Sequence, residues 1–193
     1  MQTTIVSSLR WSAQDYIGPP PDPRVTDALN EVKDTGKAGG KDGGIIWHAG
    51  LPHPEVIALM TASDYLLLPT FHDTFGYVGV EAMSVGTPVI ATNTCAQPEI
   101  VEHGVSGFLV DFENERRLGE WRWLYRKSDP EYGDAYWNEI DRLAVRMADS
   151  LSSAWENRCD YETMSAAAVD RAANRFGADR LTREIEQLYR FAD

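Results

Sequence analysis

The sequence predicts an α/β fold, in which a parallel sheet is flanked by helices and followed by an all-helical C-terminal third. Short apolar runs alternate with helical patterns up to residue 112, and this order is typical of crossover units in a parallel sheet. From residue 113 onward only helical patterns occur. We therefore expect residues 1–193 to form one domain with a Rossmann-like sheet and a helical extension from about residue 113.

Five runs have the character of strands. The runs DYLLLPT and PVIAT are apolar almost throughout, as expected of strands that are covered on both faces. The others are shorter β-branched or apolar runs. The predicted strands are residues 3–9, 45–50, 64–70, 88–92 and 107–110.

Helices are predicted between and after these strands. Pro54 and Glu55 suit the first turn of a helix, and Gly86 with Pro88 is a stop signal for another. In the last helix, apolar residues recur at three and four positions, the spacing of one helix face. The predicted helical segments are 25–33, from 53, 77–85, 98–104, 116–127, 136–155, 161–176 and 178–192.

Composition excludes several classes of protein. The net charge of −12 argues against a nucleic-acid binder, which needs a basic surface. No run of eighteen apolar residues occurs, so we expect no membrane span. Cys95 and Cys159 are far apart, and the start lacks a signal-peptide pattern, so a cytoplasmic setting is expected. The four histidines show no metal-ligand spacing.

One loop has the chemistry of a binding site. Residues 69–77 leave the carboxyl end of a predicted strand and run into a helix N-terminus, where free amides suit a phosphate. Gly76 lets the backbone approach a ligand closely, and Thr74 either caps the helix or offers its hydroxyl. Asp73 and Glu81 lie eight positions apart, a spacing that suits two separate contacts on a long ligand.

Carboxylates accept hydrogen bonds from vicinal hydroxyl groups, so a phosphate site between two acids outlines a nucleotide-sugar. Each acid alone has a simpler interpretation. Asp73 suits a helix cap or a dipole partner, and Glu81 suits a solvated helix residue. What favours the binding site is the combination of both acids with the buried strand, the glycine and the small-residue helix.

The same segment resembles a known family. The motifs that carry the resemblance are Glu81-Ala82-Met83, Gly86-Thr87-Pro88-Val89-Ile90-Ala91, Pro98-Glu99-Ile100-Val101 and Gly107-Phe108-Leu109-Val110. With these motifs, the chain from His72 to Val110 closely resembles the donor-binding region of family 4 glycosyltransferases, which are retaining enzymes of the GT-B fold. The resemblance is strong over residues 45–112 and weak over residues 3–8.

The resemblance implies roles for individual residues. Glu81 would hold the ribose hydroxyls, and Asp73 would contact the transferred sugar near the reacting carbon. The turn at Gly50 and Leu51 would lie near the base. The sugar and the distal phosphate would be bound by the backbone amides of Phe75, Gly76, Tyr77 and Val78. Amides and basic side chains stabilise the leaving diphosphate in such a fold, so the resemblance implies neither a metal nor another cofactor.

The chain departs from the family pattern in three places. Asp73 stands where the family has Glu, and Cys95-Ala96 stands where it has paired glycines. The segment TTIVSSLRW resembles the second strand of the family's C-terminal domain. We therefore expect the first strand, with the family's diphosphate-binding Arg and Lys, to be missing, and the acceptor-binding N-terminal domain or subunit to lie outside this chain.

These observations predict the donor-binding half of a retaining, hexosyl-type glycosyltransferase, which would not transfer sugar by itself. The alternative is a non-catalytic or split-subunit nucleotide-sugar-binding module that needs a partner chain. A nicotinamide-binding domain fits poorly, because no G-x-G-x-x-G follows the first predicted strand. A nucleotide-sugar epimerase of the same overall fold remains open.

Overall fold

A computed structural model describes residues 5–7, 48, 50–112 and 128–190 of the chain. The chain divides into two compact units. The first comprises Met1–Thr3 with Leu9–Val56, and the second comprises Thr4–Ser8 with Ile57–Asp193. The second unit contains the entire described sheet and residues 73–81.

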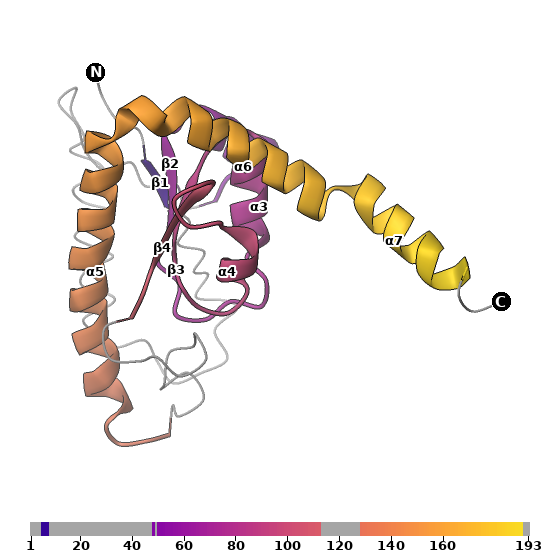
Figure 1. Cartoon of the computed structure of the whole chain (residues 1–193). Helices are drawn as coiled ribbons and strands as arrows, with labels where there is room; N and C mark the ends of the chain where they lie inside the picture. Colours follow the sequence, from indigo (N-terminus) through magenta and orange to yellow (C-terminus); the bar gives the residue numbers. More distant parts are fainter. Residues whose placement is uncertain (1–4, 8–47, 49, 113–127, 191–193) are drawn as a thin grey trace. The chain divides into compact units, whose positions relative to one another are not determined.

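The sheet of the second unit has four parallel strands (Figure 1). Their spatial order, β1-β2-β3-β4, follows the sequence. The strands are β1 (Ile5–Ser7), β2 (Tyr65–Leu68), β3 (Val89–Thr92) and β4 (Gly107–Val110). This confirms the predicted α/β class. Of the strand predicted over residues 45–50, only His48 and Gly50 are described, and neither belongs to a strand.

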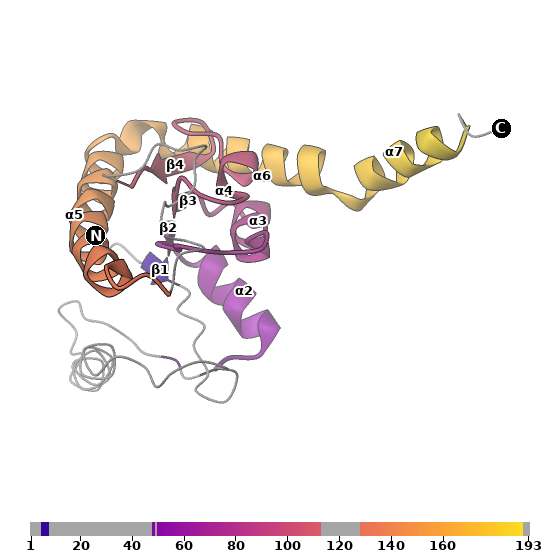
Figure 2. The ribbon, with the colours of Figure 1, turned by 90° about the horizontal axis from the view of Figure 1, so that it is seen from below.

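The central strands are buried as the sequence predicts. All four residues of β3 are buried, and Leu67 is the only half-buried residue of β2. Helix α3 (Tyr77–Ser84) covers one face of the sheet, and helix α5 (Tyr132–Glu156) covers the other (Figure 2). Between the sheet and α5, the core is formed by Tyr65, Ile90, Val110, Phe112, Leu143, Met147, Ala154 and Met164.

The remaining α-helices also agree with the predicted segments. They are α2 (His53–Thr61), α4 (Gln97–Ile100), α6 (Tyr161–Phe176) and α7 (Ala178–Arg190). The 3-10 helix η1 (Arg158–Asp160) lies between two predicted segments and was not predicted. The predicted helices over 25–33 and 116–127 lie outside the described residues. None of the helices seen in the described ranges has the length and apolar character that a membrane crossing requires.

Helix α7 shows where the helical pattern is misleading. Leu181, Ile185, Leu188 and Tyr189 recur at helical spacing, yet all four are exposed, Tyr189 by 74%. No residue of α7 is buried by the described part of the chain. Apolar spacing predicts the helix correctly here, but it does not predict which side chains become buried.

Candidate functional site

The loop between β2 and α3 is fastened to the core at its start. The hydroxyl of Thr92 in β3 donates a hydrogen bond to the carbonyl oxygen of Thr70. The ring of Phe71 packs against Phe112, with centroids 5.0 Å apart, and against Tyr136 of α5 at 4.9 Å. These contacts hold the chain at the carboxyl edge of the sheet, directly before Asp73.

The loop ends at Gly76, which is the N-cap residue of α3. Its φ of +82° and ψ of 44° lie in the left-handed region, which glycine adopts without steric cost. Within the described residues, the backbone N–H groups of Gly76, Tyr77 and Val78 donate no hydrogen bond, whereas that of Gly79 donates to the Gly76 carbonyl oxygen at 2.9 Å. The helix therefore presents free donors and a partial positive charge at this end.

Thr74 does not cap this helix. The N-cap residue is Gly76, and the Thr74 hydroxyl makes no hydrogen bond with any residue that the structure describes. Thr74 is exposed on the loop. The first sequence-based alternative for Thr74 is therefore wrong, because the helix begins two residues later than a cap at this position requires.

Asp73 lies against the start of α3. Its Oδ2 is 3.4 Å from the position that a Cβ atom on Gly76 would take. The carboxylate is half-buried and makes no hydrogen bond within the described part of the chain, so it does not act as a helix cap either. An unpaired carboxylate beside free amides can accept hydrogen bonds from a ligand that the amides also bind.

Glu81 lies further along α3. It is half-buried and shares a helix face with Tyr77 and Val78, four and three positions before it. The buried side of the same helix is formed by Gly79, Ala82 and Met83. Glu81 and the free amides therefore belong to one helix, with the acid about a turn beyond its first residue.

Phe75 and Tyr77 form an aromatic contact at the same helix end. Their ring centroids are 4.8 Å apart, and Phe75 also meets Phe176 of α6 edge-on at 5.9 Å. The Tyr77 side chain is otherwise exposed, by 70%. The C-terminal helices thus contact the residue that directly precedes Gly76.

Gln97, at the start of α4, was not singled out by the sequence. It is fully buried, and neither Nε2 nor Oε1 has a hydrogen-bond partner among the described residues. Its Nε2 lies 2.2 Å from the position of a Cβ atom on Gly76. Gly76 was expected to leave room for a ligand, but on this side Gln97 fills the space.

The backbone at Cys95 adopts a conformation that favours glycine. Cys95 has a φ of +53° and is the one non-glycine residue with positive φ in the part of the chain that the structure describes. A glycine adopts this conformation more readily than a cysteine. Cysteine therefore stands at a position whose backbone favours glycine, the residue that the family resemblance leads us to expect here.

Gly50 and Leu51 belong to the first compact unit, whereas residues 73–81 belong to the second. Gly50 is exposed, with open space where a Cβ atom would lie, and Leu51 is half-buried. Their predicted place near a base stays a prediction. Arg10, in the segment TTIVSSLRW, lies outside the described residues.

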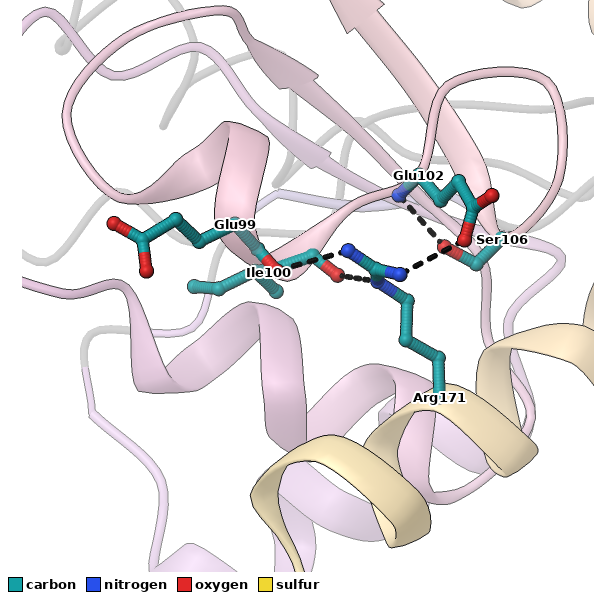
Figure 3. A network of polar contacts seen from close by, with 5 residues as sticks. All are labelled: Glu99, Ile100, Glu102, Ser106 and Arg171. Atoms are coloured by element: carbon teal, nitrogen blue, oxygen red, sulfur yellow. Dashed lines mark hydrogen bonds and ion pairs between the residues drawn. The ribbon is translucent and has the colours of Figure 1, made fainter.

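Arg171 of α6 holds the end of α4 (Figure 3). Its guanidinium donates hydrogen bonds to the carbonyl oxygens of Ile100 and Glu99 and to the carboxylate of Glu102. Glu102 is fixed in turn, because its N–H donates to the Ser106 hydroxyl at 3.0 Å. The segment that begins with Gln97 is thereby attached to the C-terminal helices.

The segment that contains this site resembles known proteins. Residues 28–120 match the family described as "Glycosyl transferases group 1". The chain contains a glycosyl transferases group 1 domain. This domain includes the whole of the loop, α3 and α4.

Curated relatives of the group 1 domain include glycosyltransferases. D-inositol 3-phosphate glycosyltransferase of Mycobacterium tuberculosis is 31% identical over 140 residues, which are 70% of this chain and 27% of that protein. An uncharacterized 41.2 kDa protein in the cps region of Klebsiella pneumoniae is 36% identical over 76 residues, or 39% of this chain and 21% of that protein. The chain thus spans about a quarter of these relatives.

Solved structures share the fold of the group 1 domain. HepE of Anabaena, crystallised in complex with UDP, matches with a TM-score of 0.62 and 22% identity, over 97% of this chain and 40% of that chain. The C-terminal domain of a group 1 glycosyl transferase from Francisella tularensis matches with a TM-score of 0.52 and 20% identity, over 81% and 66%. At these identities the likeness concerns the fold.

Proposed function

We propose that this chain is the donor-binding half of a retaining, family 4 glycosyltransferase of the GT-B fold, moving a hexose from a nucleoside diphosphate sugar to an acceptor. The observation that carries the proposal is the N-terminus of α3, where three free amides lie beside the unpaired carboxylate of Asp73. Structures of HepE, which shares the fold, contain UDP or UDP-glucose.

The proposed roles follow from this arrangement and from the family resemblance. The amides of residues 75–78 bind the distal phosphate and the sugar, and Asp73 contacts the transferred sugar. Glu81 accepts hydrogen bonds from the ribose hydroxyls. In an acidic protein, such local amides offset the repulsion between the ligand and the net charge of −12.

The leaving diphosphate carries the charge that develops during transfer. Oriented amides and a helix N-terminus stabilise such charge, and we propose that they do so here without a metal ion. We further propose a cytoplasmic enzyme in which another domain or subunit supplies the acceptor. This chain alone would then bind the donor without transferring it, the behaviour that the alternative of a non-catalytic module also predicts.

Calorimetric titration tests the proposal. The chain is titrated with UDP-glucose, GDP-mannose and ADP-glucose and with the matching nucleoside diphosphates. We expect one sugar-diphosphate pair to bind. Glu81→Gln should lower the affinity for both members of that pair by roughly tenfold, about 1.4 kcal/mol, because both compounds contain the ribose that Glu81 contacts. Asp73→Asn should weaken only the sugar-bearing member.

A matched control is Glu186→Gln, which changes an exposed acid on α7 in the same way. Binding to this variant should equal that of the unmodified chain. If the folded, unmodified chain binds none of the six compounds, the proposed function is refuted. Equal binding to the Glu81→Gln variant would refute the role of Glu81.

A further inference from the structure

The Gln97 side chain is a buried polar group for which the described structure provides no partner. It is fully shielded from solvent, and both of its polar atoms lack hydrogen bonds within the described residues. Burial of an unpaired amide costs folding free energy, and a polar group of this kind in a folded protein calls for an explanation. If Gln97 only filled space in the core, its unpaired amide would lower the stability of the fold without any compensation.

The surroundings of Gln97 supply the explanation. Its Nε2 and the Oδ2 of Asp73 both lie within 3.4 Å of one point, the position of a Cβ atom on Gly76. Gly76 is the N-cap residue of α3, so the amide, the carboxylate and the free backbone donors meet at one helix end. The Gln97 amide therefore lies next to the helix end that carries the candidate site.

We propose that Gln97 is a specificity-determining residue, which together with Asp73 binds a hydroxyl group of the transferred sugar. This inference rests on the proposed function and adds a contact to it. Turning the last side-chain torsion of Gln97 brings its NH₂ group or its carbonyl oxygen toward the ligand. The contact would provide the hydrogen-bond partner that the buried amide lacks.

The pairing of an amide with a carboxylate favours a hydroxyl over a phosphate. A hydroxyl group both donates and accepts, so it can donate to the Asp73 carboxylate and accept from the Gln97 NH₂ group. A phosphate oxygen only accepts, so it has no proton to donate to the Asp73 carboxylate. The backbone N–H groups of Gly76, Tyr77 and Val78, which only donate, are the better phosphate ligands.

Gln97→Met tests the proposal, because it keeps the length of the side chain and removes both polar atoms. Titrations use the pair that the unmodified chain binds: UDP-glucose with UDP, GDP-mannose with GDP, or ADP-glucose with ADP. We expect the affinity for the sugar-bearing compound to fall at least tenfold and that for the diphosphate to change less than twofold. The thermal midpoint of the ligand-free variant should equal or exceed that of the unmodified chain, since an unpaired buried amide is lost.

Gln187→Met on exposed α7 is the matched control and should bind both compounds normally. If Gln97→Met does not fold, Gln97→Glu, which is close in size, serves instead and should weaken the sugar-bearing compound by placing a second carboxylate beside Asp73. Unchanged binding by the folded variant would overturn the inference. The Gln97 amide of the unmodified chain would then be satisfied by water alone. Equal weakening of both compounds would also overturn it. If the unmodified chain binds no pair, the proposed function fails, and this inference fails with it.

Discussion

The Nε of Arg171 donates a 2.6 Å hydrogen bond to the carbonyl oxygen of Ile100, 71 positions earlier in the chain. The same guanidinium reaches the carbonyl oxygen of Glu99 at 3.0 Å and the carboxylate of Glu102 at 2.8 Å. Helix carbonyls near a C-terminus lack intrahelical donors and carry partial negative charge, so a cation is well placed there. Because α4 begins at Gln97, Arg171 links the helical C-terminal third to the candidate site.

Arg171→Ala should destabilise the chain by about 2–4 kcal/mol. The change removes three charge-assisted hydrogen bonds and leaves the Ile100 carbonyl group, which belongs to a fully buried residue, without its partner. Urea unfolding followed by circular dichroism measures the effect. Arg171→Lys should recover only part of the loss, because an ammonium group cannot reproduce the planar fork that spans these three acceptors.

Arg180→Ala is the control for this prediction. Arg180 forms a 2.6 Å ion pair with Glu184 one turn later on exposed α7. Pairs of this kind contribute little, so the change should stay within about 0.5 kcal/mol. If the two alanine variants lose the same small amount, Arg171 does not hold α4 in place.

Gly107→Ala should be among the most damaging small substitutions in the chain. A Cβ atom at Gly107 would lie 2.2 Å from the carbonyl oxygen of Val89 and 2.9 Å from its backbone nitrogen. Both are backbone atoms of the neighbouring central strand, so neither can turn aside. We expect the free energy of unfolding, measured in urea, to fall by more than about 3 kcal/mol, or the variant not to fold at all.

Gly133→Ala is the matched substitution at an open position. Nothing lies within 4 Å of a Cβ atom there, and Gly133 is in the first turn of α5. Alanine has the higher helix propensity, so the variant should be unchanged or more stable by up to about 1 kcal/mol. An equal loss in both variants would contradict the explanation by close approach of strands.

The fold was predictable because its signals are local. A continuous apolar run marks β2 and β3, and Gly86 with Pro88 marks the end of α3 within one or two residues. Such signals depend on neighbours in the chain, which the sequence displays directly. Burial depends on distant segments instead, and the exposed apolar side chains of α7 show that spacing alone does not predict it.

The residues of the candidate site differ in the same way: some belong to a local sequence pattern, and others depend on contacts with distant segments. Asp73, Gly76 and Glu81 occur within nine positions, so their pattern could be recognised from the sequence. Gln97 and Arg171 could not be found in this way, because Gln97 contacts residues about twenty positions away and Arg171 binds carbonyl groups 71 and 72 positions away. Neither residue belongs to a short motif, and a carbonyl acceptor leaves no mark on the sequence.

Alkaline pH should destabilise the packing of α6 on the sheet. The rings of Tyr65 and Tyr161 meet edge-on, with centroids 5.5 Å apart. Burial, and to a smaller extent neighbouring acidic groups, raises the pKa of both phenols above the ordinary value, although Arg158 opposes this shift. The neutral phenols are therefore favoured by folding. Their contribution is complete below about pH 10 and is lost as the pH rises through the raised pKa values.

Unfolding in urea at about pH 8, 10 and 11, which lie below, at and above the unfolded pKa of about 10, measures this dependence. Tyr65→Phe should reduce the loss of stability between the lowest and the highest pH. Tyr189→Phe is the control, because Tyr189 is exposed on α7, and it should leave the pH dependence unchanged. An identical decline in the unmodified chain and the Tyr65→Phe variant would show that other groups are responsible.

Cys95→Gly should stabilise the chain relative to Cys95→Ala by about 1 kcal/mol. Cys95 has a φ of +53°, in the left-handed region, where a residue with a side chain is less stable than glycine by roughly 1–2 kcal/mol. The greater chain entropy of glycine in the unfolded state offsets about half of this difference. Alanine is the proper reference, because both variants lose the thiol contact with Thr94 and only glycine relieves the backbone. Urea unfolding of the two variants measures the difference. Equal stability would mean that the backbone at this position relaxes on substitution, and the link between Cys95 and the family's glycine would then have no energetic basis.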